Sequence, residues 1–219
     1  MARLVVVVLC MLIAKLSFSQ NEVLVKLPKT GKNIRSFIPK GWIVIKEVRG
    51  DFNKDGIKDA AVVTVDSIGE KITLDSNRSV IILQGNQNGF QLSAYSAKAV
   101  LCISCGGIFG DPFEGIEFKD DKLIIYHYGG SAWRWSVTDK FRFKNNQWSL
   151  IGETKNSYWD VKECKALNDF AGTDFKDINF VTGGFEVKRI SENCKLLEHK
   201  KGKMKVSPLV TFERFSATN

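Results

Sequence analysis

Large apolar and polar residues alternate strictly along residues 133–144. The odd positions carry the large apolar side chains: Trp133, Trp135, Val137, Phe141 and Phe143. Asp139 is the one odd position that breaks the pattern. A two-residue period is the signature of a strand with one buried face. If Asn145-Asn146 forms the turn, Phe143 faces Trp148 and Phe141 faces Leu150, which gathers the apolar side chains on one side. The pattern predicts a β-hairpin over 133–150.

Further strands are predicted where β-branched and aromatic residues lie between turn signals. These strands are 43–48, 60–65, 79–83, 90–95, 177–181 and 185–190. The Asn88-Gly89 pair marks the turn before the fourth of them, because both residues tolerate positive φ. Residues 97–120 are expected to form an irregular loop, and 155–173 to hold a short helix. The sequence predicts one mainly β domain over 20–219, with antiparallel hairpins and meander sheets, little helix and a seam near 155–173.

An acidic segment between two predicted strands, residues 51–59, has the donor pattern of a calcium loop. Asp51, Asn53 and Asp55 place side-chain oxygens at alternate positions, and Gly56 permits the sharp turn. The carbonyl of Ile57 and the carboxylate of Asp59 complete the expected ligand set. The position of the bidentate acid in an EF-hand is Val62 here, so we expect a structural ion of weak affinity, about 10⁻⁴–10⁻³ M. The alternative is a solvated turn that binds nothing.

This segment, the strands at 60–65 and 79–83, and the turn at 86–90 together resemble one FG-GAP/VCBS-type repeat. In that family the loop between two strands binds calcium, and the repeats form β-propeller blades. The resemblance covers residues 48–96 and implies a propeller-blade-like calcium hairpin. It carries the calcium ligands over to Asp51, Asn53, Asp55, the carbonyl of Ile57, and Asp59. A propeller needs about four to eight blades, and only one such loop occurs. Residues 106–152 faintly resemble exported bacterial proteins, a likeness that carries no activity.

Residues 1–19 have the features of a secretory signal peptide. Arg3 precedes the apolar run from Leu4 to Ala14, and Ser17-Phe18-Ser19 supplies small residues at a cleavage site. The run is too short to span a bilayer. We therefore expect a periplasmic or secreted protein with no transmembrane segment after cleavage. Removal of the segment lowers the formal charge by two from +8, and export argues against nucleic acid as a partner.

Four cysteines remain after such a cleavage: Cys102, Cys105, Cys164 and Cys194. An even number in an exported chain favours disulfides, and we expect the pairs 102–105 and 164–194. A redox dithiol at 102–105 is an alternative, although Gly106-Gly107 is a poor helix start for activating a thiol. A zinc site made of all four is a second alternative, although such sites more often show two close pairs.

Two further features admit a binding role beside a structural one. The Trp133-Arg134-Trp135 segment could be a sugar-stacking platform, but the alternation favours core packing because an exposed aromatic face would be an unusual apolar patch. The lysine-rich stretch 195–205 could contact an anionic surface. A solvated strand edge, where lysines discourage edge-to-edge pairing, explains that stretch equally simply.

Catalytic signatures are sparse in this chain. It contains no G-x-S-x-G elbow, H-E-x-x-H helix or phosphate loop. Its two histidines are His127 in a strand-like run and His199 in the lysine-rich stretch. An Asp/Glu glycosidase needs no sequence motif and stays open. We expect a non-enzymatic binding or envelope-associated module, with a lectin-like carbohydrate binder as the alternative and an envelope hydrolase third. The expected partner is polysaccharide or another envelope protein.

Overall fold

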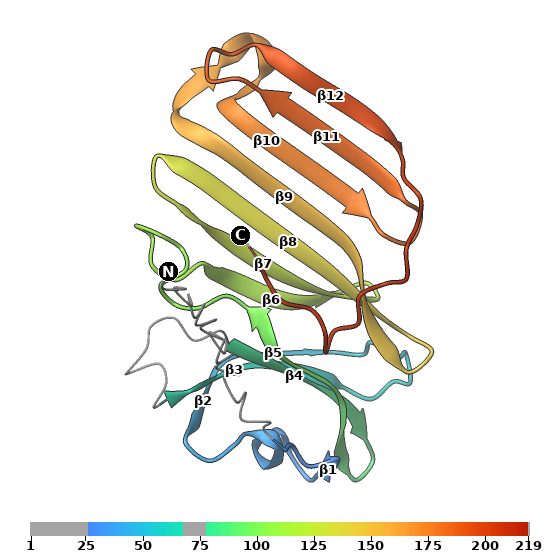
Figure 1. Ribbon diagram of the computed structural model, residues 1–219. Coiled ribbons are helices and arrows are strands. Elements are labelled where there is room, and N and C mark those ends of the chain that lie inside the picture. Colours follow the sequence, from blue (N-terminus) through green and yellow to red (C-terminus); the bar gives the residue numbers. More distant parts are fainter. Residues whose placement is uncertain (1–25, 68–77, 219) are drawn as a thin grey trace, which may run out of the picture.

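Two antiparallel sheets make up the computed structural model, which describes residues 26–67 and 78–218 (Figure 1). The predicted signal peptide lies outside those residues. The small sheet has the order β1-β5-β4-β3-β2 and consists of β1 (Thr30–Gly31), β2 (Trp42–Gly50), β3 (Asp59–Asp66), β4 (Arg78–Asn86) and β5 (Gly89–Val100). The large sheet runs in order from β12 to β6 and consists of β6 (Phe113–Lys119), β7 (Lys122–Gly130), β8 (Trp133–Lys144), β9 (Gln147–Cys164), β10 (Asp169–Asn179), β11 (Gly184–Ile190) and β12 (Leu196–Lys203). The fold is therefore mainly β, as the sequence predicts.

The main core lies between the small sheet and strands β6–β9 of the large one. Val63 and Ile82 come from the small sheet, and Ile125, Phe141 and Trp148 come from the large sheet; all five are fully buried. Phe52 at the start of the acidic segment packs edge-on against Trp148, with ring centroids 4.8 Å apart. The core therefore fixes the position of that segment.

The C-terminal segment 204–218 runs back over the large sheet and closes one side of the core. The Leu150 amide donates to the Val210 carbonyl (2.9 Å), and the Phe212 amide donates to the Trp148 carbonyl (3.0 Å). The rings of Phe212 and Phe215 each meet Phe141 edge-on at 4.9 Å. The segment therefore acts as a plug between the sheets, and it ends beside β9.

The predicted hairpin at 133–150 is confirmed as β8 and β9. Phe143 pairs with Trp148 and Phe141 pairs with Leu150, as the apolar alternation requires. Between β4 and β5, the two-residue turn is Gln87-Asn88, and Gly89 already pairs with Asn86 as the first residue of β5. Of the predicted loop 97–120, only residues 101–112 and Asp120 lie outside strands.

The short helix predicted over 155–173 is wrong. Strand β9 continues to Cys164, a single 3₁₀ turn, η2 (Lys165–Leu167), follows, and β10 starts at Asp169. Pairing with β8 on one side and β10 on the other satisfies the backbone of this segment, so the weak apolar pattern does not decide its structure. Within residues 26–67 and 78–218, no helix is long and apolar enough to cross a membrane.

Candidate functional site

The acidic loop, residues 51–58, joins β2 to β3 and turns its oxygens toward its own backbone. The Asp51 carboxylate accepts from the amides of Asp55 (3.1 Å) and Gly56 (2.9 Å), and the Asp55 carboxylate accepts from the Ile57 amide (2.8 Å). The Asn53 side chain bridges to Asp55 through its amide group at 2.6 Å. The hydrogen bond from Ile57 is the main reason that the pKa of Asp55 is lowered.

Asp59, the last predicted ligand, is fully buried at the start of β3. Its two oxygens accept from the amides of Phe52 and Gly85, both at 2.8 Å, so it connects the acidic loop to the end of β4. Burial raises the pKa of Asp59, and the negative charges of Asp55 and Asp51 raise it further. The three carboxylates therefore repel one another across the loop.

The donor set of the acidic loop fits a hard cation. Calcium prefers oxygen ligands, and a cation would offset the crowding of Asp51, Asp55 and Asp59. Over the described ranges, the side chains of His, Cys, Asp and Glu form no group of three or more that could hold a metal ion. A calcium ion would therefore need the Asn53 oxygen and backbone carbonyls such as that of Ile57 as well.

A second candidate site is the tryptophan face, which we define as one face of β8, β9 and β10. Strand register places its side chains in three rows. The first row pairs Trp133 with Trp159; the second holds Trp135, Ser157 and Asp174; the third holds Val137, Lys155 and Lys176. The face continues away from the small sheet and its main core. It therefore combines aromatic, hydroxyl, acidic and basic groups on one continuous surface.

Glycines allow two of the indoles to lie against the sheet. A Cβ built on Gly172 would lie 2.3 Å from the ring of Trp133, and one on Gly129 would lie 2.6 Å from the ring of Trp135. Gly172 also has a φ of +65°, which disfavours any residue with a side chain. Trp133 and Trp159 lie nearly parallel, with centroids 6.4 Å apart and planes inclined by 17°.

Trp133 is 43% exposed, which corrects the expectation that it packs in the core. The alternation reports the face correctly, since Phe141 on the same face belongs to the main core, but Trp133 lies outside that core. Trp135 is half-buried and contacts the edge of the main core. The exposed indole of Trp133 marks the outer end of the face.

A cavity of about 230 Å³ lies beside Trp135, in the second and third rows of the tryptophan face. Trp135 and Val137 line it from β8, and Lys155, Asn156 and Ser157 line it from β9; Asp174 and Lys176 contribute from β10. Lys155 donates to the hydroxyl of Thr218 (2.9 Å), so the end of the C-terminal segment contacts one of the lysines that line the cavity. An apolar floor with a few polar groups around it is the usual form of a small-molecule site.

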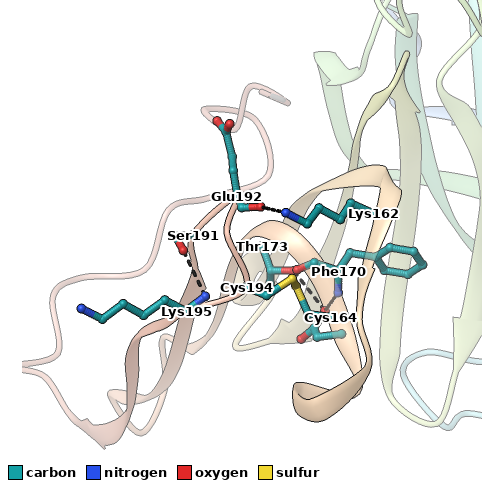
Figure 2. The surroundings of a disulfide bond; sticks show 9 residues. Lys162, Cys164, Phe170, Thr173, Ser191, Glu192, Cys194 and Lys195 are labelled. Atoms are coloured by element: carbon teal, nitrogen blue, oxygen red, sulfur yellow. Dashed lines mark hydrogen bonds between the residues drawn. A yellow bond between two sulfur atoms is a disulfide. The ribbon is translucent and has the colours of Figure 1, made fainter.

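The Cys164–Cys194 disulfide joins the end of β9 to the turn before β12 (Figure 2). Its sulfurs are 2.07 Å apart, and it belongs to a small separate core with Ala171 and Ile190, against which Trp159 packs. Lys162 donates to the Glu192 carbonyl at 2.8 Å and adds a second link between β9 and the turn before β12. The predicted pair 102–105 is also a disulfide, with an S–S distance of 2.08 Å. Two disulfides indicate an oxidising, non-cytoplasmic compartment.

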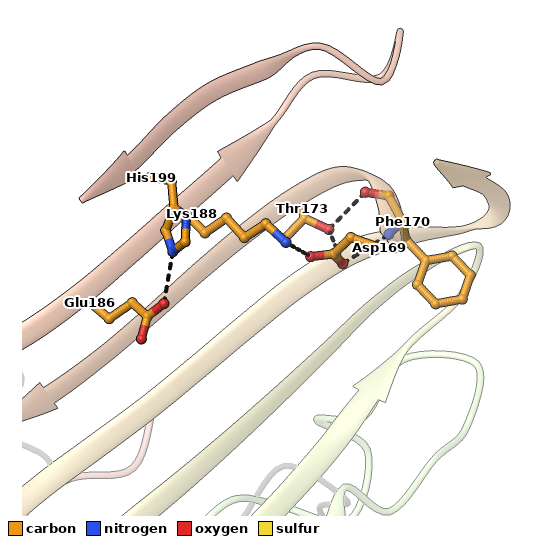
Figure 3. Close-up of polar contacts among 6 residues, drawn as sticks. All are labelled: Asp169, Phe170, Thr173, Glu186, Lys188 and His199. Carbon is orange, nitrogen blue, oxygen red and sulfur yellow. Dashed lines mark hydrogen bonds and ion pairs between the residues drawn. The ribbon is translucent and has the colours of Figure 1, made fainter. Parts of the chain in front are cut away.

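Both histidines are engaged in contacts that do not resemble a catalytic pair. His127 is buried, and its Nε2 accepts from the Leu101 amide at 3.2 Å. Burial, with the nearby Arg78 guanidinium, lowers the pKa of His127 to about 4. His199 contacts Glu186 at 2.9 Å on the other face of the large sheet, where Lys188 also pairs with Asp169 at 2.6 Å (Figure 3). Asp111 forms an ion pair with buried Arg78 at 2.9 Å.

The opposite face of β8 and β9 carries a second aromatic group at the same end of the sheet. The Arg134 guanidinium lies 4.1 Å from the ring centre of Phe109 and pairs with Asp160 at 3.1 Å. Phe109 is 48% exposed, and the neighbouring Ile108 is 80% exposed. This end of the large sheet therefore presents aromatic groups on both faces.

The structure brings together part of what the sequence singles out. Asp51, Asn53, Asp55 and Ile57 share the acidic loop, and the four cysteines pair as expected, whereas Asp59 serves as a buried link to β4. Lys155 and Trp159 were not identified as site residues from the sequence, because they lie in the segment 155–173 that was expected to hold a helix. Lys176 lies between that segment and the strand predicted at 177–181. No family model, curated protein or solved structure matches this chain.

Proposed function

We propose that this protein is an exported, non-catalytic binding module whose tryptophan face recognises carbohydrate. The observation that carries this proposal is the pair of indoles lying on Gly172 and Gly129, of which the second, Trp135, lines a cavity with an apolar floor and polar groups around it. Flat aromatic rings offer a surface for the C–H face of a sugar, and Ser157 and Asp174 offer hydrogen bonds to its hydroxyls. An indole held this way is ordered before the ligand arrives, which lowers the entropic cost of binding.

Export is part of the same proposal. The two disulfides support an oxidising compartment, and the features of residues 1–19 support a signal peptide. We place the protein in the periplasm or outside the cell, where polysaccharide is the available ligand class. The engagement of His127 and His199 in other contacts supports a role in binding rather than in catalysis.

We also infer that the acidic loop holds a structural calcium ion through Asp51, Asn53, Asp55 and the carbonyl of Ile57. Asp59 would act behind the ion, because its oxygens already accept the amides of Phe52 and Gly85. The resemblance of 48–96 to an FG-GAP/VCBS-type repeat supports this assignment. The loop lies on the small sheet, away from the tryptophan face, so the ion would stabilise the fold and would not contact the ligand.

A second candidate function is binding to an envelope protein through the opposite face. Exposed Ile108 and Phe109, with Arg134 beside them, are residue types that often dominate protein interfaces. This candidate would leave the tryptophan face unused.

Binding to a glycan array, followed by calorimetric titration of the best ligand, tests the proposed function. Trp133→Ala should weaken binding about tenfold or more, as expected for an aromatic anchor, and Trp133→Phe should recover part of the loss. Gly172→Ala should also weaken binding, because its Cβ displaces the Trp133 ring. Trp42→Ala in the small sheet is the matched control.

If no glycan binds, or if the Trp133 and Trp42 variants bind alike, carbohydrate recognition by this face is wrong. Weak binding to every glycan, together with capture of an envelope protein that Phe109→Ala abolishes, would favour the second candidate.

A further inference from the structure

The third row of the tryptophan face contains an unfavourable charge arrangement. Lys155 on β9 and Lys176 on β10 are direct cross-strand partners, and the row continues through Val187 to Lys200 on β12. Like charges placed directly opposite each other on neighbouring strands destabilise a sheet. An anion between the two lysines would remove that repulsion.

Neither lysine forms an ion pair among the described residues, although the charge of Lys155 acts on buried Asp139 and the Asp174 carboxylate lines the same cavity. Lys155 donates to the Thr218 hydroxyl, and Lys176 is exposed without an ion pair. The nearby carboxylate of Glu198 already pairs with Arg189 at 2.7 Å. Two lysines and one carboxylate, Asp174, therefore line the cavity, which leaves a net positive charge available to a ligand.

We propose that the ligand of the tryptophan face is an acidic oligosaccharide, an inference that rests on the proposed function. One sugar ring stacks on Trp133 at the outer end of the face. A neighbouring unit enters the cavity over Trp135, where its carboxylate or sulfate meets Lys176 and Lys155. The first row selects for a sugar ring, and the third row selects for its negative charge. The positive formal charge of the chain, +8 in full and +6 (8 − 2) without residues 1–19, acts in the same direction at longer range.

Matched acidic and neutral glycans test this inference. Suitable probes are oligogalacturonates with their methyl esters, and sulfated with unsulfated oligosaccharides of the same backbone. The acidic member of a pair should bind at least tenfold more tightly at low salt, and the difference should shrink at 0.5 M salt as the charges are screened. Titration calorimetry with each probe gives both affinities.

Lys176→Gln should weaken binding of the acidic form about tenfold, the size of one lost charge-assisted contact, and leave the neutral form unchanged. Lys144→Gln removes the same charge at the far end of β8 and should change neither. Trp133→Ala should weaken both forms, which non-specific attraction of polyanions would not explain.

The outcomes separate the two proposals. Equal binding of acidic and neutral forms, with both weakened in Trp133→Ala, overturns the acidic ligand and leaves carbohydrate recognition standing. Polyanion binding that Trp133→Ala does not affect also overturns the inference, because charge alone then explains it. If no glycan of either kind binds, both proposals fail together.

Discussion

Asp139 is an ionisable residue buried on an apolar face. It lies on the buried face of β8 between Val137 and Phe141, and neither of its oxygens has a hydrogen-bond partner among the residues that the structure describes. Burial raises the pKa of Asp139 to about 7; the negative charge of its cross-strand partner Glu153 adds to the shift, and Lys155 opposes it. The alternation shows this position as an exception, and the structure shows that it is buried all the same.

The stability of the protein should fall between pH 4 and pH 7 because of this carboxyl. Below pH 4, Asp139 is protonated in both the folded and the unfolded state, so it does not change the free energy of unfolding. As the pH rises toward 7, the Asp139 carboxyl ionises in the unfolded state but stays protonated in the folded state. This difference lowers the free energy of unfolding by up to about 4 kcal/mol. Asp139→Asn should therefore gain stability relative to the wild type as the pH rises. Thermal unfolding at half-unit steps from pH 4 to pH 8 measures this difference.

The exposed Asp120→Asn is the matched control, because Asp120 lies at a φ of +56° that asparagine also tolerates. Its unfolding curve should parallel that of the wild type. If the Asp139→Asn curve were parallel as well, the buried carboxyl would not be the cause of the pH dependence.

At the scale of elements, the hairpin of β8 and β9 shows how much of the strand pairing can be predicted from the sequence. Alternation and the Asn145-Asn146 turn fix the pairs near the turn, from Phe143 with Trp148 to Phe141 with Leu150. A one-residue bulge then follows, because Lys140 pairs with Gly152 and Ile151 is left over. Without this bulge, Trp133 would face Tyr158. The apolar–polar alternation does not predict the bulge, so the pairing of Trp133 with Trp159 could not be predicted from the sequence.

The acidic loop connecting β2 and β3 gives a prediction at the same scale. With a Kd of ~0.1 mM, 1 mM calcium should stabilise the chelator-treated protein by about 1.4 kcal/mol, a rise in Tm of roughly 3–5 °C. Asp51→Asn combined with Asp55→Asn should abolish the shift by removing two charged donors. Thermal scans with and without calcium, together with calorimetry, measure it. An equal shift in the double variant, or no heat and no shift in the wild type, contradicts a site in this loop.

At the scale of the whole molecule, long-range contacts decide what local patterns cannot. The plug formed by 204–218 fills the space between the sheets through Phe212 and Phe215, although its sequence shows no strand or helix period. The mainly β class and the separate hairpins follow from local residue patterns. The division into two sheets does not, because it depends on which apolar faces meet across the core.

The two disulfides should differ in their contribution to global stability. Cys164 and Cys194 are 30 residues apart, whereas Cys102 and Cys105 are separated by three. The entropic stabilisation by a disulfide grows with the length of the loop that it closes. Replacing Cys164 and Cys194 by serine should therefore lower the free energy of unfolding by about 3.5 kcal/mol, and replacing Cys102 and Cys105 by about 2 kcal/mol. Urea denaturation of both double variants gives these values.

The variant in which serine replaces Cys164 and Cys194 should also bind glycans less well, because Trp159 packs on the small core that contains both cysteines. Equal losses of stability in both variants would show that loop closure is not the main contribution.

The outer strands of the large sheet have a different consequence. β11 and β12 bury little on either face; β12 forms the open edge, and its lysines discourage pairing with other chains. Side chains there can change with little effect on packing, so the sequence of this region is limited mainly by solubility. Substitutions on these two strands should therefore leave the interior between the two sheets unchanged.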